Sequence, residues 1–273
     1  MKTIIFIFIF LISHLIASDK LIFGAISTVE AELMKKKLMP LMNYIQSKTG
    51  KTIEFQTGYD YADTIEKFAN GTFDIGYIGP SPYVKAKKIN PNSLTIVAKL
   101  KNSTQDSFKS VIISKKGSSI SKLEDLNDKR FAFGSPNSTL SYYVPMSMLI
   151  DNKLVHKLKH YDFLGRHDRV AQYVIMGKYD AGAIKKSVAD KYSKYLQVVA
   201  LSKTFPDFMI VANPKIEKEI LEKLKKAILT LKDKNILKSL KNSAIGFEKA
   251  KDDDYDDLRI IMNHVDEFGH VNQ

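Results

Sequence analysis

The stretch Phe73-Asp74-Ile75-Gly76-Tyr77-Ile78-Gly79-Pro80-Ser81-Pro82 passes from a short apolar segment directly into a turn with two prolines. Short apolar runs of this kind are typical of buried parallel strands. The stretch therefore predicts a strand at 73–78 that leads into a helix reaching about residue 88. A strand followed at once by a helix is the repeating unit of α/β proteins.

The same unit recurs on both sides. Upstream, predicted strands at 21–26 and 52–55 alternate with helical patterns at 29–48 and 61–68, which indicates a parallel sheet wrapped by helices. Further strands are predicted at 94–100, 110–113, 130–133, 159–164, 179–184, 196–201 and 208–211. Helices are predicted at 123–126 and at 168–176, and another is predicted to follow the polar turn at 134–139 and run to about residue 150. Further helices are predicted from Asn213-Pro214 onward and at the C-terminus.

We interpret this rhythm as an α/β protein of two lobes joined by short crossings near 101–109 and 202–212. Residues 19–104 plus 209–273 form the first lobe in this interpretation, and residues 105–208 form the second.

The composition is that of a globular protein, with 44% hydrophobic and 26% charged residues among 273. The absence of cysteine excludes a disulfide framework, a thiolate metal site, a cysteine nucleophile and a lipid-modified N-terminal cysteine. No dinucleotide-binding, phosphate-loop or zinc-protease motif is present. We therefore expect no metal, no cofactor and no enzymatic activity.

The first 18 residues combine Lys2, an apolar run at 4–12 and a polar segment that ends at Ala17-Ser18. This pattern predicts a cleaved secretory signal peptide. The alternative is a membrane anchor, but the apolar run is shorter than the ~20 residues that a spanning helix needs. The mature chain is expected to be exported and, in a cell with two membranes, periplasmic.

The formal net charge is +12, and it is +11 once residues 1–18, which contain one lysine and no acid, are removed. Such a charge can indicate nucleic-acid binding. Here the lysines are spread along predicted helices, as in 215–241, and an exported protein does not meet nucleic acid. We expect a solvated lysine-rich surface and no nucleic-acid partner.

Three polar loops follow predicted strands at the points where helices begin. They are Ser27-Thr28, Gly79-Pro80-Ser81 and Asn137-Ser138-Thr139, the last with Ser141. Ligands of open α/β sheets bind at the carboxyl ends of strands, and helix N-termini attract oxyanions. Each loop taken alone is also explained by simple helix capping. Together with the aromatic residues Tyr61 and Tyr77, the three loops favour a site for a small anion.

Several ordered motifs resemble the substrate-binding proteins of phosphate, phosphite and phosphonate ABC transporters. They are Asp60-Tyr61-Ala62-Asp63-Thr64, Asp74-Ile75-Gly76-Tyr77-Ile78-Gly79-Pro80, Ser135-Pro136-Asn137-Ser138-Thr139, Gly165-Arg166-His167-Asp168 and Pro206-Asp207-Phe208. The resemblance covers essentially the whole mature chain. It implies a two-lobed type II periplasmic-binding-protein fold that closes over a ligand in the cleft between the lobes.

The resemblance also implies site residues. Tyr61 corresponds to the family's ligand-contacting tyrosine, Ser138 and Thr139 to its Ser-Thr at a helix start, and His167 to its histidine. Tyr77 or Ile78 supplies the aromatic loop, and Asp207 matches a second acid. The candidate site is thus Ser27, Thr28, Tyr61, Tyr77, Ile78, Ser81, Ser138, Thr139, Ser141, His167 and Asp207.

In aminoalkylphosphonate binders of this family a carboxylate receives the amine of the substrate. The corresponding stretch here is Lys185-Lys186-Ser187, so we expect anions without an amine to bind better than 2-aminoethylphosphonate. We expect His167 to be the main ionisable partner of the anion, with its protonated form favouring binding.

The implied function is capture of phosphate, phosphite or an alkylphosphonate by a monomer that delivers it to an inner-membrane ABC permease. The alternative is a sensory protein that reports to a receptor kinase or chemoreceptor.

Overall fold

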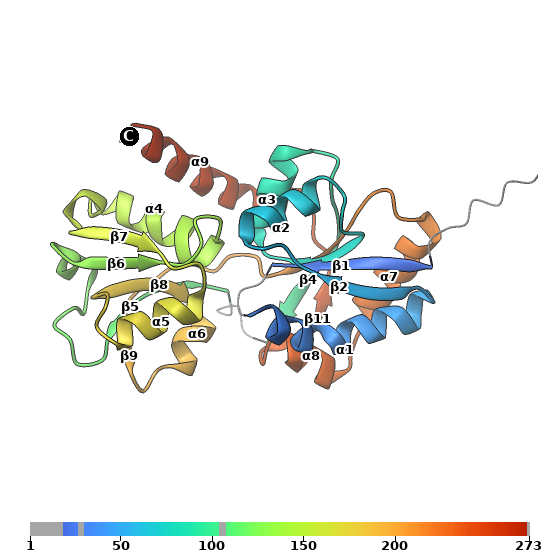
Figure 1. The fold of residues 1–273 in the computed structure, drawn as a ribbon, viewed down its shortest axis with the longest axis horizontal. Helices are drawn as coiled ribbons and strands as arrows, with labels where there is room; N and C mark the ends of the chain where they lie inside the picture. The colour runs from blue at the N-terminus through green and yellow to red at the C-terminus, as the bar shows by residue number, and fades with distance from the viewer. Residues whose placement is uncertain (1–18, 27–29, 104–107, 272–273) are drawn as a thin grey trace, which may run out of the picture.

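The computed structural model describes residues 19–26, 30–103 and 108–271, which form two α/β lobes lying side by side (Figure 1). The first lobe contains a six-stranded sheet in the order β11-β4-β10-β3-β1-β2, and the second a five-stranded sheet in the order β7-β6-β8-β5-β9. Within these described ranges, no helix is long and apolar enough to span a bilayer.

The sheet of the first lobe is built from both ends of the chain. Its strands are β1 (Lys20–Ala25), β2 (Thr52–Gln56), β3 (Ile75–Ile78), β4 (Thr95–Asn102), β10 (Met209–Ala212) and β11 (Ala244–Glu248). β1 pairs in parallel with β2 and β3, as the alternation predicts. β10 then lies between β3 and β4, antiparallel to both, and β11 is antiparallel to β4. The sheet is therefore mixed rather than wholly parallel.

Helices cover both faces of this sheet (Figure 1). One face packs against α1 (Ala31–Thr49), α7 (Lys218–Thr230) and α8 (Lys234–Leu240), and the other against α2 (Tyr61–Ala69) and α3 (Pro80–Ile89). The residues of α1 with helical spacing in the sequence are the buried ones, including Leu38 and Ile45. Pro40 lies inside α1 without ending it.

The second sheet is formed by β5 (Ser110–Lys115), β6 (Arg130–Phe133), β7 (His160–Phe163), β8 (Ala181–Lys185) and β9 (Leu196–Leu201). α5 (His167–Ile175) and α6 (Lys186–Lys191) pack on one face. The π-helical turn η3 (Thr139–Tyr143) and α4 (Val144–Asp151) pack on the other. Short 3-10 turns lie at η2 (Leu123–Leu126), η4 (Val155–Lys157) and η5 (Asp252–Tyr255).

All strands of the second sheet lie within residues 105–208. The C-terminal helix α9 (Asp256–Val271), which the expected division gives to the first lobe, packs on α3 of the first lobe and on α4 of the second. Figure 1 shows α9 extending from one lobe across to the other.

Two glycines allow close packing between β1, β3 and the helix layer. Gly24 and Gly76 are paired across the two strands. A Cβ atom on Gly76 would lie 2.2 Å from the ring of Phe68, and one on Gly24 would lie 2.2 Å from the ring of Phe73. The two rings pack edge to face with centroids 4.8 Å apart, so both glycines are needed for the aromatic layer to sit on the strands.

The helix predicted from Asn213-Pro214 begins instead at Lys218. The side chain of Asn213 accepts a hydrogen bond from the amide of Lys215 at 2.9 Å and donates one to the carbonyl of Gly71 at 3.3 Å. Asn213 thus stabilises a turn that delays the helix. α6, α8 and β11 were not predicted, because each is short and lacks a clear apolar period.

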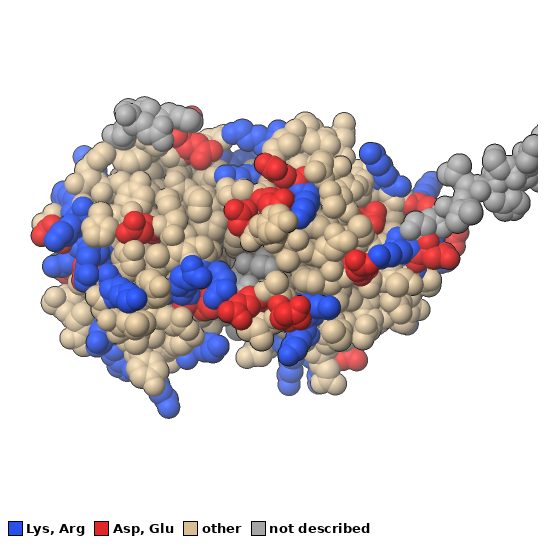
Figure 2. Space-filling view, viewed as in Figure 1, with Lys and Arg blue, Asp and Glu red and all other residues tan. Residues whose placement is uncertain are grey.

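Basic side chains lie over both lobes on the face shown in Figure 2, with acidic side chains between them. Many lysines are in ion pairs, for example Lys223 with Glu219 and Lys203 with Asp257. This distribution is that of a solvated surface with mixed charges.

Candidate ligand-binding site

A small cavity of about 20 Å³, which we call the inner cavity, lies between the lobes. Its lining includes four of the predicted site residues, Tyr61, Ser138, Thr139 and His167, together with Ile26, Gly79, Pro82, Phe108, Leu140, Lys185 and Phe208. A single water needs roughly 10–15 Å³ of such volume. Only a compact group therefore fits the inner cavity while the lobes are in this position.

Four helical segments begin at the inner cavity. Tyr61 is the first residue of α2 and His167 the first of α5, while Gly79 and Ser138 precede α3 and η3. The first N–H groups of a helix have no partner within the helix and carry a partial positive charge. The four helix starts therefore give the inner cavity a positive potential that comes from partial charges on backbone N–H groups.

Two hydroxyl groups at this cavity act together. The Oγ atom of Ser138 accepts a hydrogen bond from the amide of Ser141 at 3.3 Å, and Ser138 is also hydrogen-bonded to the phenol of Tyr61. Desolvation raises the pKa of Tyr61, with the bond to Ser138 acting in the opposite direction. Tyr61 is thus a neutral phenol that can donate a hydrogen bond.

Ser81 and Thr139 connect the lobes directly. The amide of Ser81 donates to Oγ1 of Thr139 at 2.9 Å, and the two hydroxyl oxygens are 2.7 Å apart. Ser81 Oγ also donates to the carbonyl of Asn137 at 2.9 Å. We call these bonds the interlobe clasp. The hydroxyls of Ser81 and Thr139 thus bond to each other across the cleft.

His167 is 4% exposed, and its Nδ1 atom accepts a hydrogen bond from the amide of Lys185 at 3.0 Å. Desolvation, and then the positive charge of Lys185, lower the pKa of His167 to about 3. The ring is therefore neutral near pH 7, with its proton on Nε2. The expected binding-competent form was the protonated one; in this structure burial and the acceptor role of Nδ1 disfavour that form.

The other predicted residues lie elsewhere. Ile78 is fully buried in the core, and Ser141 is fully buried with an Oγ atom that has no hydrogen-bond partner among the described residues. Tyr77 and Asp207 line a second cavity rather than the inner one. Ser27 and Thr28 lie outside the described residues.

The second cavity, which we call the outer cavity, has a volume of about 940 Å³ and adjoins the inner one. Phe108, Lys185 and Phe208 line both. Phe208 stacks on Tyr77 with ring centroids 4.8 Å apart and meets Phe108 edge to face at 5.9 Å. An aromatic wall thus runs from one cavity into the other.

Asp207 is 6% exposed, and its carboxylate is fully engaged. It accepts hydrogen bonds from Lys241 at 2.5 Å, from Asn102 at 2.9 Å and from the amide of Phe208 at 2.7 Å. Asp207 is therefore the counter-ion of a lysine. Desolvation lowers the pKa of the nearby Lys37, which the charge of Asp207 partly offsets.

Sequence reasoning missed Lys37, Phe108 and Lys241 at these cavities. Phe208 was quoted only as part of a motif, and the role of Lys185 was left open. Lys37 lies on α1 and Lys241 directly follows α8, both of which pack on the first sheet. Nothing in the sequence context of either lysine distinguishes it from the surface lysines.

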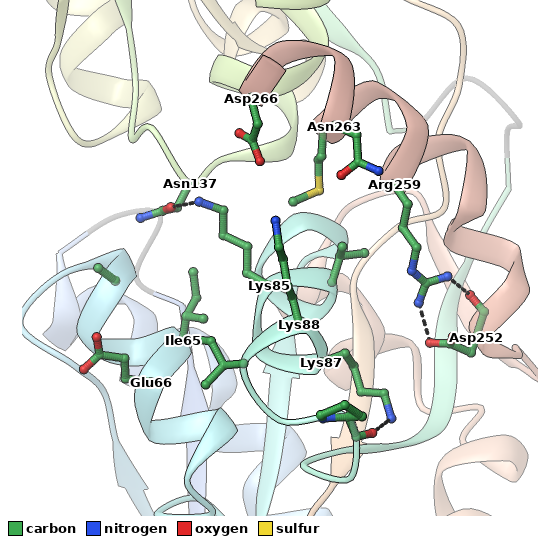
Figure 3. Close-up of a pocket in the computed structure, with 15 residues that line it drawn as sticks. Ile65, Glu66, Lys85, Lys87, Lys88, Asn137, Asp252, Arg259, Asn263 and Asp266 are labelled. Atoms are coloured by element: carbon green, nitrogen blue, oxygen red, sulfur yellow. Dashed lines mark hydrogen bonds and ion pairs between the residues drawn. The ribbon is translucent and has the colours of Figure 1, made fainter. Parts of the chain in front are cut away.

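A third cavity, of about 600 Å³, lies between α2, α3 and α9 (Figure 3). Lys85 reaches from α3 to the side chain of Asn137, and Asp266 on α9 lies above it. Asn137 borders this third cavity, while the next two residues border the inner one, so the interlobe clasp separates the two spaces. Among the residues that the structure describes, no group of three or more His, Asp and Glu is placed to hold a metal ion.

Residues 23–255 match the family described as ABC transporter, phosphonate, periplasmic substrate-binding protein. The chain is 26% identical over 220 residues to the phosphate-import protein PhnD of Mycolicibacterium smegmatis, covering 74% of this chain and 68% of that protein. It is 27% identical over 234 residues to a probable phosphite-binding protein, PhnD1, of Prochlorococcus marinus, covering 76% of each.

Two solved structures share the fold. One is PhnD1 of Prochlorococcus marinus in complex with methylphosphonate, with a TM-score of 0.82 and 24% identity over 91% of this chain and 98% of that one. The other is a binding protein of an ABC phosphonate transporter from Pseudomonas aeruginosa, with a TM-score of 0.82 and 21% identity over 94% of this chain and 90% of that one.

Proposed function

This chain belongs to the family of periplasmic substrate-binding proteins of phosphonate ABC transporters, and from that premise we propose that it captures a small phosphorus oxyanion for import. The candidate ligands are phosphate, phosphite and short alkylphosphonates, as the names of its relatives suggest. The observation that carries the proposal is the inner cavity, where four helix starts and neutral donors surround a compact space.

In the proposed complex the anion accepts hydrogen bonds from neutral groups. The donors are the Tyr61–Ser138 pair, in which one hydroxyl donates to the other and the remaining O–H donates to the anion, Nε2 of His167 and the first amides of η3 and α5. Ser27, Thr28 and the Ser81–Thr139 pair complete the proposed site, while Tyr77 and Asp207 shape its outer part. Ser141 acts indirectly, through the amide that donates to Ser138. Hydrogen bonds to a charged partner contribute more than neutral ones, so a few such donors suffice for tight binding.

We further propose that residues 1–18 are a signal peptide removed on export, that the mature protein carries no lipid anchor, and that it acts as a monomer. It would hand the ligand, unchanged, to a membrane permease. Membership of this family favours transport over the sensory role.

The direct test is a thermal-shift panel of phosphate, phosphite, hypophosphite, methylphosphonate and 2-aminoethylphosphonate, with sulfate as the control anion. A ligand at one hundred times its Kd stabilises the folded state by about 2.7 kcal/mol, which corresponds to about 5–10 °C in Tm. We expect this shift with at least one amine-free phosphorus anion and little with sulfate. Absence of a shift with every phosphorus compound would contradict the proposed function.

A further inference from the structure

The outer cavity is rich in positive charge. Its lining contains six lysines, namely Lys37, Lys185, Lys186, Lys191, Lys238 and Lys241, but only two aspartates, Asp190 and Asp207. These lysines come from both lobes, since Lys37 lies on α1 and Lys185 ends β8. The excess of positive charge is therefore a property of the space between the lobes.

Both aspartates already have partners. Asp190 pairs with Lys186 at 2.8 Å, and Asp207 with Lys241 at 2.5 Å. Lys37 and Lys185 are half-buried, and within the described part of the chain neither ammonium group makes a hydrogen bond or an ion pair. A partly buried ammonium without a partner is unfavourable, and an anion supplied from outside removes that cost.

The lowered pKa values of these two lysines agree with this geometry. Desolvation, the charge of Lys37 and that of Lys241 lower the pKa of Lys185 to about 7, while Asp207 and Asp168 act in the opposite direction. A negative group placed beside Lys185 would restore its protonated form.

The position of Lys185 connects the two cavities. It lines the inner and the outer cavity, next to the aromatic wall of Phe108 and Phe208. A ligand whose phosphorus group occupies the inner cavity can extend its carbon chain along this wall. Its far end would then lie among Lys185, Lys37 and Lys241.

We propose that the outer cavity binds a second negatively charged group of the ligand, so that this chain prefers phosphonates whose tail ends in an anion such as a carboxylate. This inference rests on the proposed function and specifies its ligand class.

The test compares three ligands that share a phosphonate and a two-carbon spacer. They are 3-phosphonopropionate with a terminal carboxylate, propylphosphonate with a terminal methyl group, and 2-aminoethylphosphonate with a terminal ammonium. Calorimetry on the wild-type protein should give at least tenfold tighter binding of 3-phosphonopropionate than of propylphosphonate, and the weakest binding for the amine.

Lys185→Gln and Lys37→Gln remove one charge each from opposite lobes. Each should lower the affinity for 3-phosphonopropionate about ten- to a hundredfold more than the affinity for propylphosphonate, because a charge-assisted contact is lost. Lys194→Gln is the matched control, since it removes the same charge from an exposed site on the second lobe outside the cavity. It should leave the ratio of the two affinities unchanged.

Methylphosphonate separates the two proposals. Suppose that methylphosphonate binds but 3-phosphonopropionate binds no better than propylphosphonate. The inference about the outer cavity is then overturned, and the proposed function stands. The same conclusion follows if both lysine variants keep the wild-type ratio of the affinities for 3-phosphonopropionate and propylphosphonate. If no phosphorus compound binds, both are overturned.

Discussion

At the scale of single residues, His167 has a defined protonation state. Its Nδ1 atom accepts the amide of Lys185, so the neutral ring presents an N–H at Nε2. A neutral donor binds an oxyanion without a competing change in its own charge. Titration of His167 should therefore contribute little to any change in affinity for a fully ionised ligand between pH 6 and pH 8.

Stability should depend on the same residue at lower pH. The pKa of His167 is about 3 when folded and about 6.5 when unfolded, so the unfolded state binds the proton more readily. The stabilisation is fully present above pH 6.5 and is lost as the pH falls toward 3, with a slope of up to about 1.4 kcal/mol per pH unit. Urea titrations at pH 7, 5.5 and 4.5 should show this loss in the wild type and a smaller one in His167→Asn. Parallel curves for the two proteins would mean that His167 is not buried and neutral.

The interlobe clasp gives a second prediction. Thr139→Val keeps the shape of the side chain but removes the partner of the Ser81 amide and hydroxyl. The closed arrangement should become less populated, and apparent affinity falls with that fraction. We expect about tenfold weaker binding of phosphite and methylphosphonate alike, with a larger radius of gyration by X-ray scattering in the ligand-free protein.

Ser114→Ala is the control for the clasp. Its hydroxyl is also fully buried, but it donates to the carbonyl of Ile120 within the second lobe. It should lower stability without changing affinity. If Thr139→Val left both affinity and scattering unchanged, the clasp would have no part in closure.

At the scale of helices and strands, the glycine pair of β1 and β3 is the most sensitive packing feature. Gly76→Ala would place a Cβ atom 2.2 Å from the ring of Phe68, which is fully buried and must shift. Such overpacking costs about 1–3 kcal/mol. Chemical denaturation should show a loss of this size.

Gly269→Ala is the matched control for that substitution. The site is in α9, and a Cβ atom there meets nothing within 4 Å. Because alanine has a higher helix propensity than glycine, the free energy of unfolding should rise by up to about 1 kcal/mol. Equal effects of the two substitutions would contradict the packing argument.

The sequence predicted most of these elements, because the apolar spacing of α1 and the apolar runs of β1 and β3 are local signals. It did not predict that β10 lies between β3 and β4, since strand order depends on contacts far apart in the chain. The start of α7 was misplaced because the turn chemistry of Asn213 competes with helix capping.

The candidate site shows the same division between local and distant signals. Ser138, a polar residue at a helix start, could be found from the sequence pattern, and His167 from the family resemblance. The resemblance did not specify that Ser81 and Thr139 bond to each other, or that Lys37 of α1 lines the same cavity as Lys185. Those facts depend on how the lobes meet.

At the scale of the whole molecule, the lobes share one hydrophobic core. A cluster of buried residues runs from Phe68 and Tyr83 in the first lobe to Phe131 and Leu149 in the second. Leu258 and Met262 of α9 belong to the same cluster. Because the core is common to both lobes, neither should unfold by itself.

Scanning calorimetry should therefore show one unfolding transition. Leu224→Ala acts on a core confined to the first lobe, and Val170→Ala on one confined to the second. Each should shift the same single peak to a lower temperature. The reason is that large-to-small core changes lower the free energy of unfolding by several kcal/mol. Two resolved peaks in either variant would show that the lobes unfold separately.

The central place of β10 in the first sheet bears on how the chain folds as it is made. β10 follows the whole second lobe in the sequence, so β3 and β4 emerge long before the strand that joins them. Residues 110–201, in contrast, contain all five strands of their own sheet. The second sheet can form as soon as that segment has emerged, while the inner edges of β3 and β4 remain open to non-native pairing. The interval of greatest aggregation risk therefore lasts until residues 209–212 have left the ribosome or the export channel.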